Sequence, residues 1–128
     1  MAEAKAYFLS VVFLAKPVSE RLFVGLSAAT RVMPQTLVEA GAREPTRQEG
    51  YRRQALGKDD WTFEGNGVIV SKAVTFRNDG RELWPELAFS FLATTEDNSG
   101  VLLAWAALDR ARMQFPGDEL VLPLRIRF

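Results

Sequence analysis

The sequence predicts an all-β protein, an antiparallel β-sandwich of jelly-roll-like type with a short N-terminal helix or arm. From residue 51 onward, short apolar runs of strand length alternate with turn residues, which is typical of sandwiches and barrels. The last strand alternates outward and inward side chains without a break. A chain of 128 residues with 48% hydrophobic residues buries about two-thirds of its unfolded surface, so we expect one domain over residues 1–128.

Residues 1–16 form the predicted N-terminal helix or arm. The stretch Tyr7–Ala15 is almost entirely apolar, and Pro17 pushes the residue before it out of helical geometry. Good helix formers stand beside the β-branched pair Val11-Val12, so periodicity leaves both forms open. The stretch is well short of the roughly 20 residues that span a bilayer, and an acidic residue near the start is unlike a signal peptide. We expect no membrane span and no export.

A strand is expected over Arg21–Ser27, where phenylalanine and valine suit a pleated, half-buried surface. Residues 28–50 follow as a long loop that contains prolines, glycines and scattered charges. Loops longer than about 12–15 residues are uncommon in compact domains. This loop is therefore expected either to be functional or to contain a short element such as Leu37–Ala42.

Further strands are predicted between polar turns. They are Tyr51–Leu56, Trp61–Phe63, Val68–Phe76, Leu83–Thr94 and Val101–Leu108. Gly65-Asn66-Gly67 is a strong turn signal, and Pro85 places the start of its strand at an edge or a bulge. The run Val101–Leu108 has hardly any polar face, which predicts a strand buried on both sides.

The final strand has the clearest pattern in the chain. One face would hold Leu120, Leu122, Leu124, Ile126 and Phe128, and the other Val121, Pro123, Arg125 and Arg127. Because this alternation continues to the last residue, we expect the C-terminus to be held in the sheet.

Composition excludes much chemistry. The chain has no cysteine and no histidine, which removes disulfides, thiolate nucleophiles, histidine bases and the usual zinc sites. It has 16 Lys and Arg against 16 Asp and Glu, so no net field attracts nucleic acid or an acidic membrane. We predict no enzyme, no cofactor, no metal and no direct contact with nucleic acid.

Carboxylate pairs are the remaining candidates for catalysis. Asp59-Asp60 and Glu96-Asp97 both lie in polar, turn-like segments, where aspartate normally bonds its own backbone. A glycosidase pair would instead need a defined separation across a cleft and one raised pKa. The triplet Asp97-Asn98-Ser99 supplies fewer oxygen ligands than calcium usually takes. A structural role in turns is the favoured interpretation of both pairs.

Basic and aromatic residues offer two further candidate sites. The arginines are Arg43, Arg47, Arg52 and Arg53, and Glu39, Glu44 and Glu49 are interleaved with them. The mixed signs favour a salt-bridged loop that docks on a neighbouring subunit over a phosphate site. The three tryptophans suggest either a sugar-stacking platform or core and interface anchors.

Several motifs, in order, resemble a family of small structural proteins of tailed bacteriophages. These motifs include LYVGLS-like, GYARQAV-like, AVTF, FALF-like, LLAWGAL-like and GDTLSF-like segments. The matching stretches here are Leu22–Ser27, Gly50–Leu56, Ala73–Phe76, Leu87–Leu92, Leu102–Leu108 and Gly117–Leu122. The charged loop over residues 28–50 departs from the family pattern, which has more glycine, serine and threonine there.

The resemblance implies a virion component without catalytic residues, assembled in the host cytoplasm. We expect a capsid decoration (cement) protein that binds the major capsid protein or another virion protein as a homo-oligomer, for example a trimer. The candidate interface residues are Phe8, Val12, Phe13, Val32, Met33, Leu37, Arg43 and Arg47. The arm could equally cover the chain's own sandwich. The alternatives are a tail fibre or tip subunit, and a carbohydrate-binding sandwich that uses Trp61 or Trp84.

Overall fold

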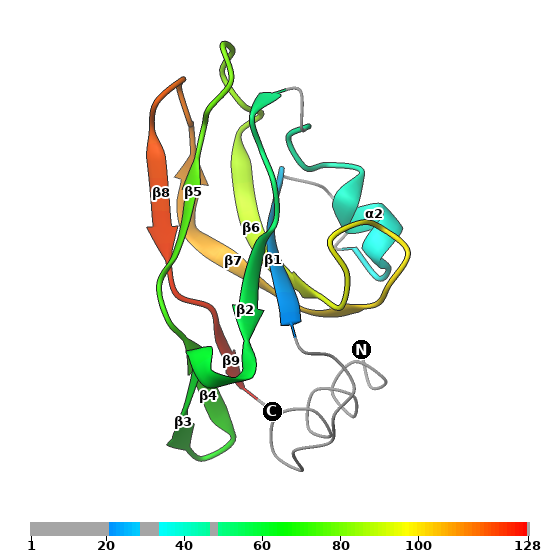
Figure 1. The fold of residues 1–128 in the computed structure, drawn as a ribbon, viewed down its shortest axis with the longest axis vertical. Coiled ribbons are helices and arrows are strands. Elements are labelled where there is room, and N and C mark those ends of the chain that lie inside the picture. Colours follow the sequence, from blue (N-terminus) through cyan, green and yellow to red (C-terminus); the bar gives the residue numbers. More distant parts are fainter. Residues whose placement is uncertain (1–20, 29–33, 47–48, 128) are drawn as a thin grey trace.

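The computed structural model describes residues 21–28, 34–46 and 49–127, so the predicted N-terminal helix or arm lies outside the described residues. The described chain is all-β and sandwich-like, as predicted, and its strand pairs are antiparallel (Figure 1). The strands are β1 (Arg21–Ala28), β2 (Gln54–Gly57), β3 (Trp61–Gly65), β4 (Val68–Ser71), β5 (Val74–Arg77), β6 (Leu87–Ala93), β7 (Leu102–Arg112), β8 (Glu119–Leu122) and β9 (Arg125–Arg127). A helix, α2 (Leu37–Gly41), and a 3-10 turn, η2 (Lys58–Asp60), join them.

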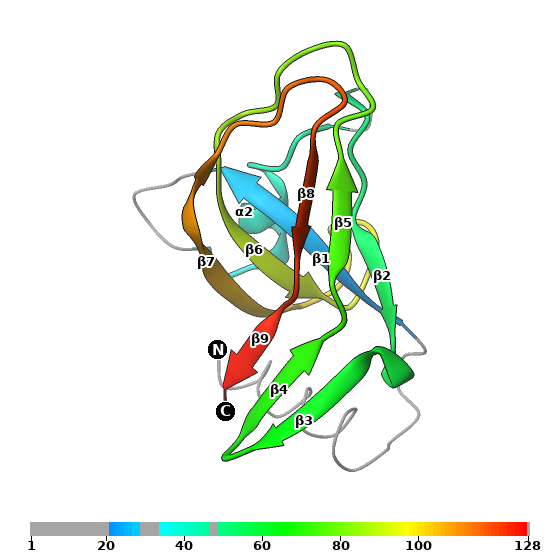
Figure 2. The same ribbon diagram turned by 90° about the vertical axis from the view of Figure 1, so that its left-hand side faces the viewer.

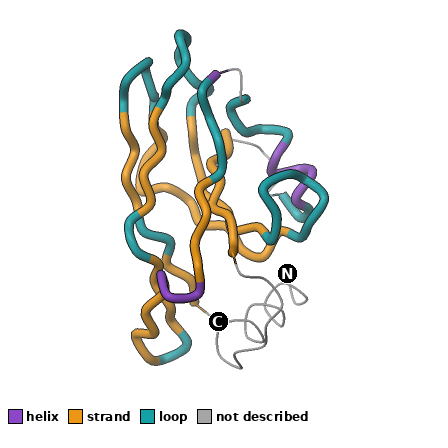
Figure 3. The backbone as a smooth tube through the Cα atoms, viewed as in Figure 1, coloured by secondary structure: helices purple, strands orange, loops and turns teal. Residues whose placement is uncertain are grey.

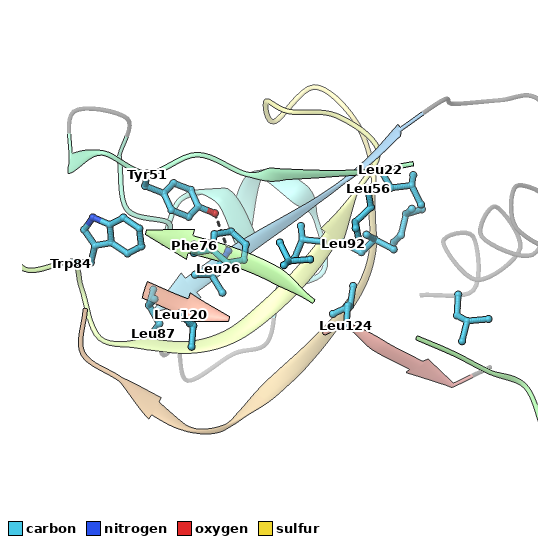
Figure 4. Packing of buried hydrophobic residues seen from close by; sticks show 14 residues of the cluster. Leu22, Leu26, Tyr51, Leu56, Phe76, Trp84, Leu87, Leu92, Leu120 and Leu124 are labelled. Carbon is cyan, nitrogen blue, oxygen red and sulfur yellow. Dashed lines mark hydrogen bonds between the residues drawn. The ribbon is translucent and has the colours of Figure 1, made fainter. Parts of the chain in front are cut away.

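The core lies between two layers of strands. One layer is the four-stranded sheet β2-β1-β6-β7, and the other contains the pair β5-β8 and the sheet β3-β4-β9 (Figure 2). Alternate residues of facing strands meet in between, where aromatic and branched side chains bury most area (Figure 4). The core residues are Leu22, Val24, Leu26, Tyr51, Leu56, Ile69, Val74, Phe76, Trp84, Leu87, Leu92, Leu103, Leu120 and Leu124.

Two strands that the sequence predicted as continuous are each broken. The run from Val68 to Phe76 divides into β4 and β5, and the final strand divides into β8 and β9. Both breaks occur at the same level, because β4 pairs with β9 and β5 pairs with β8. Pro123 has no N–H to donate to the hydrogen-bond ladder between strands. The N–H of the next residue, Leu124, donates to the hydroxyl of Ser71 at 2.9 Å. The inward alternation survives the break, since Leu120 and Leu124 are both buried.

The prediction that Val101–Leu108 is buried on both faces is wrong. Within β7 only Leu102 and Leu103 are buried, and the rest of the strand is partly or fully exposed. Among the described strands, β7 is the last of its sheet, with β6 as its neighbour, and it continues to Arg112. Elsewhere the strands are shorter than predicted at their starts, with β2 beginning at Gln54 and β6 at Leu87.

The short element expected inside the long loop is present as α2, which packs to one side of the sandwich (Figure 3). The turn predicted at Gly65-Asn66-Gly67 is also present, joining β3 to β4. All three residues have positive φ, at 88°, 54° and 73°. Such angles favour glycine and asparagine, which explains the sequence of this turn.

Candidate functional site

Helix α2 covers the outer face of the four-stranded sheet. Leu37 and Ala40 on the helix pack against Phe91 and neighbours from β6 and β7. The ring of Phe91 occupies the space where Gly25 lacks a side chain, since an added Cβ would be 2.3 Å from its Cζ atom. The side chain of Thr36 accepts from the Glu39 N–H at 3.2 Å and begins the helix. These contacts place the loop that follows α2 beside the start of β7.

A buried arginine holds this loop against two other segments. The Arg53 side chain, 3% exposed, forms a two-pronged ion pair with Glu44, with Nε–Oε2 at 3.0 Å and Nη2–Oε1 at 2.6 Å. Its remaining N–H groups donate to the carbonyls of Thr95 and Asp97 and to Asn98 Oδ1, at 3.1, 2.5 and 2.5 Å. We call this set, with Tyr51, the Arg53 network.

Tyr51 completes the network from the core side. Its hydroxyl donates to Glu44 Oε2 at 2.5 Å. The same hydroxyl accepts from the Leu26 N–H at 2.8 Å, the bond that Figure 4 draws as a dashed line. Burial, together with the adjacent Glu44 charge, raises the pKa of the Tyr51 phenol well above its ordinary value of 10.0. The guanidinium also lies 5.1 Å from the centre of the Phe91 ring. The network therefore joins the α2 loop, the entry to β2, the β6–β7 loop and β1.

The chemistry open to this site is limited by its own bonds. All five N–H donors of a guanidinium are engaged, and both Glu44 oxygens accept from Arg53. A cavity of about 290 Å³ beside the network is lined by Glu44, Tyr51, Asp97 and neighbours. Because the charges of Arg53 and Glu44 satisfy each other, this geometry stabilises the loops that meet at the network.

The two carboxylate pairs are in turns, as the sequence suggested. Asp60 Oδ2 accepts from the Gly57 N–H at 2.7 Å, and this bond lowers the pKa of the Asp60 carboxyl. Asp97 Oδ1 accepts from the hydroxyl and N–H of Ser99, which lowers its pKa as well. A lowered pKa is the opposite of what a catalytic acid needs.

The oxygens considered for calcium are already occupied. Asn98 Oδ1 and the Asp97 carbonyl accept from Arg53, whose positive charge disfavours a second cation there. Across the described residues no group of three or more acidic, histidine or cysteine side chains is placed to hold a metal ion.

Only two of the predicted interface residues, Leu37 and Arg43, lie within the described part of the chain. Leu37 is 2% exposed and belongs to the chain's own packing, whereas Arg43 is exposed. The others lie outside the described residues, namely Phe8, Val12, Phe13, Val32, Met33 and Arg47. Of the remaining predicted arginines, Arg52 is exposed and Arg53 is buried. In an extended segment, side chains two residues apart point to the same side, so Tyr51 and Arg53 could have been predicted to lie together. That spacing is the sequence signal for the network.

The tryptophans give little support to a sugar-stacking platform. Trp84 is 1% exposed, and its Nε1–H donates to the Glu49 carbonyl at 2.7 Å. Trp61 and Trp105 are partly buried and pack against the two hydrophobic clusters. These rings are anchors of the fold.

The outer surface above the Arg53 network is exposed and partly apolar. We define the α2 face as residues 35–46 and 94–101, two segments that touch where Gly41 meets the Asn98 side chain. Val38 on this face is 61% exposed and Val101 is 50% exposed. Figure 1 shows α2 beside the loop between β6 and β7. The network below fixes the shape of this surface.

Comparison of the sequence with protein-family models and with curated proteins finds no match. None of the helices in the described ranges is both long and apolar enough to cross a membrane.

Proposed function

We propose that this protein is a structural component of a bacteriophage virion, most specifically a capsid decoration protein that binds the shell through the α2 face. The observation that carries the proposal is the Arg53 network. Its polar groups bond one another and hold two loops in place, so its effect is to present a preformed surface. Preformed surfaces lose little conformational freedom on binding, which favours docking.

Two further features support a structural role in a particle. The surface above the network combines exposed valines with mixed charges, which suits a protein partner. The motif order described above resembles small tailed-phage structural proteins. A symmetric shell offers many copies of one site, so a homo-oligomer with modest contacts would bind tightly through several at once. The proposed partner is the major capsid protein or another virion protein.

The copy number per particle tests this proposal directly. In purified particles of the virus that encodes the chain, a stained gel calibrated against the major capsid protein measures this number. Decoration predicts hundreds of copies. A handful would place the protein in the tail as a fibre or tip subunit and overturn decoration. Absence from the particle would overturn the virion proposal itself.

A surface variant tests the α2 face. Val38→Asp adds a charge to an exposed helix position and should reduce cosedimentation with purified shells by about tenfold, because a charge buried without a partner opposes docking. Thr75→Asp on β5 is the matched control, since Thr75 is exposed on the far layer. Equal binding by both variants, with unchanged melting temperatures, would exclude the α2 face.

A further inference from the structure

Two loops at one end of the sandwich present large apolar side chains to solvent. Residues 77–86 lead from β5 to β6 and residues 113–119 lead from β7 to β8, and both lie at the same end in Figures 1 and 2. Met113 is 48% exposed and Phe115 is 56% exposed, and Leu83 on the other loop is exposed as well. We call these two loops together the tip.

The tip reverses the usual direction of burial. Gln114 is buried and its Oε1 atom accepts no hydrogen bond from the described residues, whereas Met113 and Phe115 on either side of it are exposed. A shift by one residue would bury the apolar pair instead. The other loop holds the observed arrangement, because the Gln114 carbonyl accepts from Asn78 Nδ2 at 2.9 Å and from the Trp84 N–H at 3.1 Å. An exposed apolar cluster that is fixed in this way is typical of an interaction surface.

A groove on the side of the same molecule is suited to receive an apolar side chain. It lies between β7 and the strands β8 and β9 and has a volume of about 360 Å³, within the range of about 300–1,000 Å³ that is usual for ligand pockets. Ala106, Leu108 and Leu122 line it and are only partly buried, although they pack against the core. Val121, which also lines the groove, is exposed.

Charge distinguishes the tip from the groove, although the chain as a whole is neutral. The tip carries five carboxylates and two arginines, namely Asp79, Glu82, Glu86, Asp118 and Glu119 with Arg77 and Arg81. The strand segments around the groove, residues 106–112 and 120–127, carry four arginines and one aspartate. Glu64 on β3 pairs with Arg125 at 2.6 Å and leaves this region positive. The acidic tip therefore complements the groove and would be repelled by an acidic membrane.

We propose that the tip of one copy docks in the groove of a second copy, where Met113 and Phe115 cover the apolar lining. Each copy has one tip and one groove, so two copies can exchange both contacts about a two-fold axis, or more copies can close a ring. The inference rests on the homo-oligomer of the proposed function and names the surfaces that join its subunits. The α2 face shares no residue with either surface and is left for the shell.

Sedimentation of the full chain over a concentration series tests the docking without any virus particle, so its outcome is separate from the copy number. The unaltered protein should self-associate. Phe115→Asp should raise the dissociation constant about tenfold, because a charge buried without a partner opposes docking. Val38→Asp is the matched control, an exposed valine on the α2 face, and should associate like the unaltered protein. A monomer at every concentration, or equal association by both variants, would overturn the proposal.

Mixing two variants tests whether the tip meets the groove. Val121→Asp adds a negative charge at an exposed position of the groove and should also weaken self-association about tenfold. A mixture of Phe115→Asp and Val121→Asp retains one intact groove and one intact tip, so it should associate about tenfold more tightly than either variant alone. Melting temperatures equal to that of the unaltered protein show that both variants are folded. Absence of this recovery would overturn the pairing and indicate contact between two tips or two grooves.

Discussion

At the scale of single residues, Arg53 shows how a surface-type residue becomes part of a core. Its charge is balanced by Glu44, and its other donors reach the carbonyls of Thr95 and Asp97 and the side chain of Asn98. In the sequence, Arg53 belongs to a cluster of arginines, and no local pattern separates it from the others. Only the three-dimensional meeting of the loops distinguishes it from its neighbour Arg52, which is exposed.

Removing this guanidinium should be strongly destabilising. Arg53→Ala removes the positive charge that balances the largely buried Glu44 carboxylate, and losing one partner of a buried ion pair costs about 3–5 kcal/mol. Arg53→Lys should recover little, because a lysine head cannot reproduce the planar two-pronged pairing. Denaturant unfolding measures the change. Arg52→Ala is the control, expected within about 0.5 kcal/mol of the unaltered protein; a similar loss in both variants would contradict a special role for Arg53.

Tyr51 should make stability depend on pH in the alkaline range. Burial raises the pKa of its phenol above 10.0, the ordinary value, so above that pH the unfolded chain releases a proton that the folded chain retains. The unfolded state then binds fewer protons, and the free energy of unfolding falls as pH rises. The stabilisation that the protonated Tyr51 phenol contributes is fully present below pH 10 and is lost as the pH rises above it. Unfolding titrations from pH 8 to 11 should show a shallower decline for Tyr51→Phe; parallel curves would refute this assignment.

At the scale of elements, edges and breaks decide what each strand does. Val68 to Phe76 has the pattern of one strand, yet its two halves pair in different sheets, because β9 and β8 divide at Pro123. The alternation of side chains survives such a break, so the sequence predicted which residues face inward. It did not predict the break, since that depends on the partner strand. The edge position of β7 was missed for the same reason.

One buried amide joins the loops at one end of the sandwich. Asn78 is 1% exposed and donates from Nδ2 to the carbonyls of Glu82 and Gln114, both at 2.9 Å. Asn78→Ala leaves these carbonyls with fewer donors and should cost about 1–3 kcal/mol in the free energy of unfolding. Hydrogen exchange should rise in the loops after β5 and β7. Asp79→Ala, at the exposed next position, is the control, and an equal effect of both changes would count against this role.

At the scale of the whole molecule, the positive and negative charges of the chain balance. With 16 basic and 16 acidic residues, the chain has no net field to concentrate counterions or attract a polyanion. A DNA-binding protein with six to ten phosphate contacts loses about 10³–10⁵ in affinity between 50 and 200 mM salt. Binding to shells should change by less than about tenfold over that range, as measured by cosedimentation. A steep salt dependence would instead indicate electrostatic docking.

The sequence by itself determined the all-β class, the inward and outward faces of most strands, the short element inside the long loop and the main turns. These features depend on local patterns, namely two-residue alternation and the backbone preferences of glycine, asparagine and proline. Only the tertiary structure decided which strands pair, which strand is an edge, and which arginine is buried. Those outcomes depend on contacts between residues far apart in the chain, such as Arg53 with Asn98, for which a local pattern has no signal.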